Sequence, residues 1–163
     1  MRGLNEKIYR LLQILMTLML GLMIIPVTMQ IFSRFVDFIP RYIWTEEAAR
    51  FCLIWLIMLG ATIAVRDGTH FDVDVLPAPE TNKAKAIGQF VVHLSMLLVA
   101  MTFIIFGWRF ALFGLQQDSE MTGINMLWIH AAWPVAGICW FLFLVEKIVA
   151  DVRLYKEVSN GSI

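Results

Sequence analysis

Charged residues are scarce in this chain of 163 residues: Lys, Arg, Asp and Glu together make up 16% of it, whereas 60% is hydrophobic. Soluble domains carry about 25% charged residues, so this scarcity excludes an ordinary water-soluble fold. The 13 basic and 13 acidic side chains also cancel. Because the net charge is zero, the chain has no overall positive field to attract a nucleic acid, and we expect no nucleic-acid partner.

Cysteines and catalytic motifs are also lacking. The only two cysteines, Cys52 and Cys139, lie inside apolar segments without CxxC spacing, which indicates small packing residues. The sequence has no glycine-rich phosphate loop, and its Ser, His, Asp and Cys residues suggest no catalytic arrangement. We therefore predict that the chain is not an enzyme and holds no cofactor or metal of its own.

What the chain has instead is long apolar runs. Three of them lack any charge over at least the roughly 20 residues that a membrane-spanning helix needs. They cover residues 11–33, 86–108 and 121–145. A fourth run, residues 51–65, is too short to cross unless its helix begins earlier and takes in Glu46, Glu47 and Arg50.

The sequence thus predicts an all-α integral membrane protein, a single membrane domain over residues 1–163 with four transmembrane helices. The expected helices cover approximately residues 8–36, 45–66, 84–115 and 123–151. Because the number of crossings is even, both termini lie on one side, and most basic residues flank that side. These are Arg2, Lys7, Arg10, Arg66, Lys83, Lys85, Lys147, Arg153 and Lys156, against Arg34, Arg41, Arg50 and Arg109. We expect both termini in the cytoplasm and the chain in the inner membrane of a bacterial or archaeal cell.

The helix expected over residues 45–66 carries charges in its first turns. Arg50 follows Glu46 by four residues and Glu47 by three, so its guanidinium can reach either carboxylate. One interpretation is a helix-end cluster that extends to the lipid head groups. We favour the other, in which the remaining carboxylate contacts another helix or chain, because charged groups in membranes usually face protein or water.

The same helix offers signals at its two ends. Thr45 is a candidate N-cap, and Gly68 suits a left-handed C-terminal cap. Gly60 and Ala64 form a small-xxx-small pair that permits close approach of another helix. The loop that follows contains Asp67, His70, Asp72 and Asp74, whose spacing matches neither an EF-hand nor a zinc site. A solvated loop is expected there.

Two alternative functions can be weighed against the sequence. A haem-binding electron-transfer subunit would hold iron between histidines of facing helices. His93 and His130 are instead expected to differ by about 15 Å or more in membrane depth, too far to share one iron. A self-sufficient small exporter would need an ionisable residue deep in a span, and residues 11–33 contain none.

Three segments follow one another along residues 44–74 of the chain: Trp44-Thr-Glu46-Glu47-Ala-Ala-Arg50, Trp55-Leu-Ile-Met-Leu-Gly60-Ala61 and Arg66-Asp-Gly68-Thr-His70-Phe-Asp72-Val-Asp74. In this order they resemble the small membrane (Q-type) subunit of tripartite ATP-independent periplasmic (TRAP) transporters. Gln30-Ile-Phe-Ser-Arg34-Phe and Pro134 after Trp128 are also similar, so the resemblance spans most of the chain. The residues expected to form a subunit interface or a structural polar cluster are Trp44, Glu46, Glu47, Arg50, Trp55, Gly60, Ala64, Arg66, His70 and Asp72.

The resemblance implies a non-catalytic scaffold subunit of a sodium-coupled secondary transporter, working with a large permease subunit and a periplasmic solute-binding protein. It also implies that the large subunit binds the sodium and the cargo, an organic acid such as a C4-dicarboxylate, a sialic acid or a sugar acid. We hypothesise that the helix over residues 45–66 faces the large subunit or the bundle interior. A second hypothesis assigns docking of the binding protein to the acidic outer loop with Asp118 and Glu120. Membrane lipid is the remaining expected partner.

Overall fold

The protein is all-helical in the residues that its computed structural model describes, which are 2–36, 38, 40, 42–68 and 82–159. Side chains are described from residue 3 to 153, apart from residues 4 and 82–86 in the helices. The helices are α1 (Arg2–Phe35), α2 (Trp44–Asp67), α3 (Asn82–Gly114), α4 (Leu127–His130) and α5 (Ala132–Ser159). The predicted all-α class is therefore confirmed.

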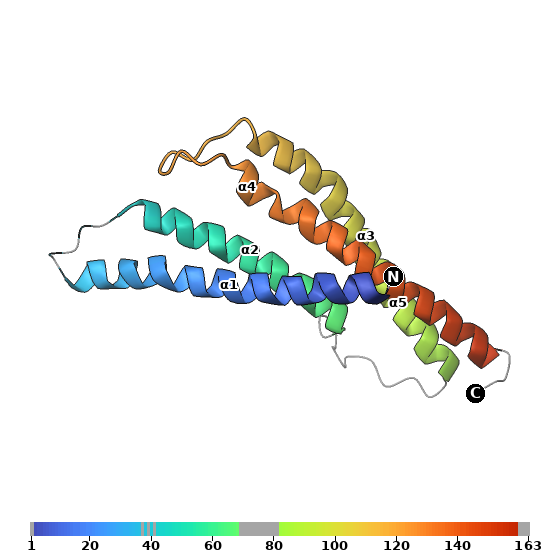
Figure 1. Cartoon of the computed structure of the whole chain (residues 1–163). Coiled ribbons are helices and arrows are strands. Elements are labelled where there is room, and N and C mark those ends of the chain that lie inside the picture. The colour runs from blue at the N-terminus through green and yellow to red at the C-terminus, as the bar shows by residue number, and fades with distance from the viewer. Residues whose placement is uncertain (1, 37, 39, 41, 69–81, 160–163) are drawn as a thin grey trace.

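Two antiparallel hairpins make up the fold (Figure 1): α1 packs along α2, and α3 packs along α5. The hairpins meet mainly through α2 and α5. They converge at one end, where α1 begins and α5 ends, and diverge toward the other. We name these the closed end (residues 5–9, 65–68 and 146–151) and the open end (residues 35–36, 42–45 and 115–130).

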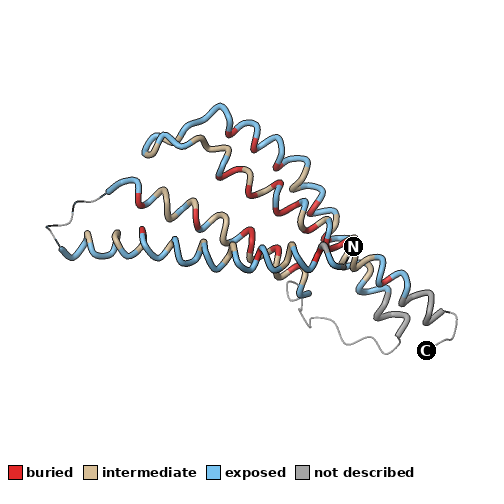
Figure 2. The backbone as a smooth tube through the Cα atoms, in the orientation of Figure 1, coloured by how far each residue is buried: buried red, intermediate tan, exposed pale blue. Residues whose placement is uncertain are grey.

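Three helical segments in the described part of the chain are long and apolar enough to cross a membrane. They are Asn5–Phe35, Trp44–Asp67 and Ile87–Gly114. The segment in α2 is the most buried of the three, and Figure 2 shows α1 exposed along most of its length. Of these three segments, the one in α2 is thus the most deeply placed inside the chain's own bundle.

The bounds of α2 confirm that its helix starts ahead of the short apolar run and includes Glu46, Glu47 and Arg50. Its C-terminal cap is the predicted one: Gly68 has φ 77° and donates its N–H to the Ala64 carbonyl at 3.0 Å. The predicted N-cap is wrong. Thr45 lies inside the helix and donates its hydroxyl backwards to the Tyr42 carbonyl at 2.7 Å.

The last helix begins later than expected and is interrupted. Turns and an isolated bridge between Asp118 and Asn125 lie within residues 115–126, and the short α4 is separated from α5 at Ala131. Pro134 explains the interruption, because it has no N–H to donate to the carbonyl of His130 one turn earlier.

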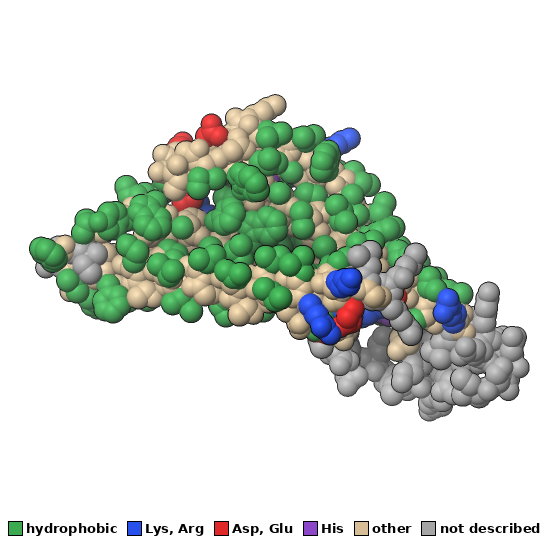
Figure 3. All heavy atoms as spheres, in the orientation of Figure 1, with side chains coloured by type: hydrophobic (Ala, Val, Ile, Leu, Met, Phe, Trp, Pro, Cys, Tyr) green, Lys and Arg blue, Asp and Glu red, His purple; other side chains and the backbone are tan. Residues whose placement is uncertain are grey.

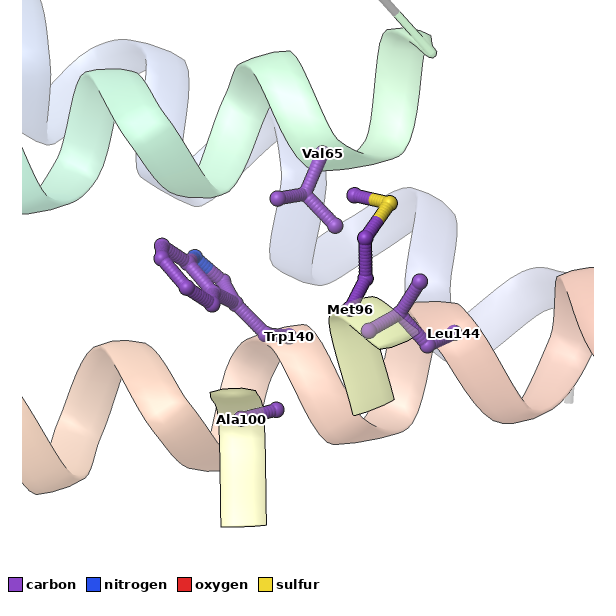
Figure 4. Packing of buried hydrophobic residues seen from close by; sticks show 5 residues of the cluster. All are labelled: Val65, Met96, Ala100, Trp140 and Leu144. Atoms are coloured by element: carbon purple, nitrogen blue, oxygen red, sulfur yellow. The ribbon is translucent and has the colours of Figure 1, made fainter. Parts of the chain in front are cut away.

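The core lies where α2, α3 and α5 meet. Its largest cluster, shown in Figure 4, consists of Val65, Met96, Ala100, Trp140 and Leu144. Lipid tails are as apolar as these side chains, so association of the helices depends on close packing and satisfied polar contacts. Gly107 and Gly137 supply the close packing of α3 on α5: a Cβ at Gly137 would lie 3.0 Å from the Ile104 backbone nitrogen.

Candidate functional site

Arg66 is the centre of a polar cluster at the closed end. Its Nη2 lies 2.6 Å from Glu6 Oε2, and its Nη1 donates to the Asn5 carbonyl at 3.3 Å. The guanidinium also lies over the Tyr9 ring, 4.1 Å from its centroid. One side chain of α2 thus makes three kinds of contact with α1.

Further side chains connect α5 to this cluster. Asn5, which is buried, donates its amide to the Glu146 carboxylate. Lys147 Nζ donates to the Val65 carbonyl at 2.8 Å, in the last turn of α2. Such contacts satisfy carbonyls that have no partner within the helix. The closed end therefore ties α1, α2 and α5 together.

A buried hydrogen bond links the hairpins deeper in the bundle. Trp140 Nε1 on α5 donates to Thr62 Oγ1 on α2 at 2.9 Å, and the Thr62 hydroxyl donates to the Met58 carbonyl at 2.7 Å. Thr62 is only 1% exposed. Both polar groups are thus satisfied away from water, as buried polar groups must be.

The charges at the start of α2 divide into two groups at the open end. Arg50 pairs with Glu46 at 3.6 Å, and the two side chains are 64% and 66% exposed, so the pair is solvated and weak. The Glu47 Oε2 atom is buried and accepts no hydrogen bond from any residue that the structure describes. Glu47 is therefore the carboxylate left over.

Two clefts share Glu47. A polar one of about 590 Å³ lies between the start of α2 and the segment after α3, and it is lined by Glu47, Arg50, Asp118 and Glu120 among others. The structure thus joins two features that are far apart in the sequence. Figure 3 shows acidic side chains over the segment between α3 and α4, and mixed charges at the closed end.

The two acidic residues of this segment differ in their surroundings. Asp118 accepts a hydrogen bond from Asn125 Nδ2 at 3.1 Å, and Asn125 Oδ1 accepts from the Leu127 N–H at 3.0 Å. Asp118 therefore helps to fold the turn that leads into α4. Glu120 is exposed.

The second cleft is apolar, has a volume of about 480 Å³ and lies between the two hairpins at the open end. Residues of α1, of α2 and of the segment around α4 line it. They include Pro26, Trp44, Glu47, Phe51, Cys52 and Trp128. Both tryptophans are partly exposed, as expected at a membrane interface.

The other residues expected at an interface are dispersed. Trp55 Nε1 donates to the Trp128 carbonyl at 2.9 Å and joins α2 to α4. Gly60 faces α1 loosely, since the atom nearest to an added Cβ, among the described residues, would be Met16 Sδ at 4.0 Å. Ala64 provides the carbonyl that binds the cap at Gly68. His70 and Asp72 lie outside the described residues.

The histidines have separate partners. His93 on α3 lies 2.5 Å from Asp151 on α5, between its Nδ1 and the carboxylate Oδ2. His130 stacks on Phe110, with 3.9 Å between ring centroids. Phe110 is 17 residues after His93 along α3, which corresponds to about 25 Å at 1.5 Å per residue. The two histidines thus lie at opposite ends of the bundle.

These features define a helical membrane protein whose two hairpins are joined by polar side chains at one end and separated by clefts at the other. The chain belongs to the DctQ component family of tripartite ATP-independent periplasmic transporters, because residues 23–154 match the model of that family. It is a membrane subunit of a TRAP transporter.

Individual relatives agree with this assignment. A Haemophilus influenzae protein that carries the name of a TRAP transporter small permease is 28% identical over 93% of this chain and 94% of its own. The sialic acid TRAP transporter small permease SiaQ of Vibrio cholerae is 22% identical over 99% and 93%. The sialic acid TRAP transporter permease SiaT of Haemophilus influenzae is 33% identical over 78% of this chain, but over only 21% of its own length.

Proposed function

We propose that this chain is the static, non-catalytic small subunit of a binding-protein-dependent secondary transporter that imports an organic acid. The match to SiaT carries the proposal. In that protein, a segment similar to most of this chain makes up only about a fifth of a much longer permease polypeptide. A segment that can be joined covalently to a large permease is expected to lie against it when the two are separate chains.

In the proposed topology, α5 is the fourth span and both termini are cytoplasmic, with the chain in the inner membrane. The arrangement in which α1 begins and α5 ends at the closed end supports an even number of crossings. Basic residues on α1, α2 and α5 gather at that end, as expected for a cytoplasmic side. They are Lys7, Arg10, Arg66, Lys147 and Arg153.

The polar contacts of the closed end support a scaffold role. Arg66, Asn5 and Lys147 connect three helices through side chains, which favours one fixed arrangement of the hairpins. In the proposed complex, the large subunit binds the sodium and the cargo. The cargo is a C4-dicarboxylate, a sialic acid or a sugar acid.

Removal of this chain tests the proposal. We expect the tagged large permease to co-purify with this chain, and uptake of the cargo to fall to background in cells that lack it. A large permease that transports at its full rate alone would overturn the proposal.

The polar cleft is the proposed docking surface for the solute-binding protein. Glu120 is the residue to change, because Asp118 also holds the turn that leads into α4. We expect Glu120→Lys to slow uptake and to reduce its dependence on salt, with Glu120→Gln intermediate, because complementary charges mainly steer association. Uptake by Glu120→Lys with unchanged salt dependence would exclude this docking surface.

A further inference from the structure

The apolar cleft at the open end combines a long apolar wall with one carboxylate. Its lining is almost entirely apolar, from Leu22 and Pro26 on α1 to Phe51 on α2. Glu47 lies on the wall with its Oε2 atom buried and without a hydrogen-bond donor among the described residues. A buried carboxylate oxygen is costly unless a donor reaches it, so the cleft calls for an occupant with an apolar body and a donor.

The shape and lining of the cleft suit a flexible hydrocarbon chain. Its volume is about 480 Å³, and the residues from α1, α2 and the segment around α4 that line it are almost all apolar. An acyl chain can follow such a space without displacing a helix and loses no hydrogen bonds on entering it.

The position of the cleft agrees with a lipid occupant. Trp44 and Trp128 line it and are each partly exposed, which places it at the level of the head groups. Arg50 lies one turn after Glu47 and lines the adjoining polar cleft with it. A carboxylate and a guanidinium side by side complement a head group that carries an ammonium and a phosphate.

We propose that the apolar cleft binds a zwitterionic phospholipid with an ammonium head group, of the phosphatidylethanolamine class. One acyl chain occupies the cleft, the ammonium donates to Glu47, and the phosphate lies toward Arg50. The lipid fills the space between the hairpins and completes the polar contacts of Glu47. In the proposed orientation the open end lies on the periplasmic side, so the lipid belongs to the outer leaflet. The site itself does not depend on that orientation.

Lipid retention by the purified full chain tests the site. Native mass spectrometry in micelles that contain equal amounts of phosphatidylethanolamine and phosphatidylglycerol should show about a tenfold preference for the former, equivalent to about 1.4 kcal/mol. Glu47→Gln should abolish this preference. Glu46→Gln is the matched control, because Glu46 is exposed and does not line the cleft. No preference in the wild type, or an equal loss in both variants, would overturn the proposal.

A photocross-linking residue identifies the occupant without changing Glu47. At Phe51, inside the cleft, we expect an adduct with the mass of one ethanolamine phospholipid in the assembled transporter. At Leu53, which is exposed on another face, lipid adducts should show no head-group preference. A cross-link from Phe51 to the large permease would overturn the lipid site but support the proposed complex, so the two proposals fail separately.

Discussion

The buried hydrogen bond between Trp140 and Thr62 gives the sharpest test of how the hairpins are held. Thr62→Val removes the acceptor of this hydrogen bond inside the core, at a cost of about 1–3 kcal/mol. Trp140→Phe removes the donor, while the Thr62 hydroxyl keeps its bond to the Met58 carbonyl. We expect this variant to lose about 1 kcal/mol for the bond, and further stability for the lost volume.

The double variant Thr62→Val/Trp140→Phe separates the contribution of the hydrogen bond to stability from that of the lost side-chain volume. Because the two side chains share one hydrogen bond, the double variant should be less destabilised than the sum of the single variants, by about 1 kcal/mol. Interhelical bonds in membrane proteins average about 0.6 kcal/mol in such cycles and reach about 1.7. The measurement is reversible unfolding of the purified chain in detergent micelles, followed by tryptophan fluorescence or circular dichroism.

Thr102→Val is the matched control for this cycle. Among the residues that the structure describes, Thr102 bonds the Leu98 carbonyl of its own helix, and it is exposed. Its replacement should therefore change stability by less than about 0.5 kcal/mol. The reasoning would be refuted if the destabilisations by Thr62→Val and Trp140→Phe added in the double variant to within about 0.3 kcal/mol. It would also be refuted if Thr62→Val were as stable as the Thr102→Val control.

Three further predictions concern helix packing and the two ends of the bundle. Gly137→Ala should destabilise the chain by about 1–3 kcal/mol, because the added Cβ would clash with the backbone of α3. Gly21→Ala is the control: its Cβ would meet open space, so this variant should be neutral or stabilising. Thermal unfolding of both variants measures the difference. Arg66→Ala should lower the melting temperature clearly more than Arg50→Ala, because the Arg66 side chain is 25% exposed and that of Arg50 64%. Equal shifts would contradict the closed-end cluster. Trp55→Phe should lower the free energy of unfolding by about 1 kcal/mol in the same assay, because it removes the hydrogen bond to the Trp128 carbonyl of α4. An unchanged stability would show that this bond does not stabilise the fold.

Local features of α2 could be predicted because local rules determine them. The minimum length of a spanning helix required an early start, and Gly68 at the end of the helix predicted the left-handed cap that the structure has. The same reasoning predicted a surplus carboxylate near Arg50. It could not predict which carboxylate pairs with Arg50, because Glu46 and Glu47 are both within reach of its guanidinium along the helix. In the structure Glu46 forms the pair, and Glu47 does not.

Contacts between distant segments could not be predicted. Asn5 and Glu146 are 141 residues apart, and nothing local to either indicates the other. The resemblance to TRAP subunits singled out Arg66, but its partners on α1 depend on how the hairpins pack. The shared cleft of Glu47 and Glu120 arises from that packing as well. The break before α5, by contrast, has a local cause in the sequence, because Pro134 cannot donate to a carbonyl one turn earlier.

The static scaffold is tested most directly by a distance between the two hairpins in the assembled transporter. Spin labels at Ile31 on α1 and Leu112 on α3, both exposed, would report on the open end after Cys52 and Cys139 are replaced by Ala. We predict that pulsed electron paramagnetic resonance gives the same distance distribution with and without sodium, cargo and binding protein. A shift of about one helical turn, roughly 5 Å, on addition of the cargo would contradict the account.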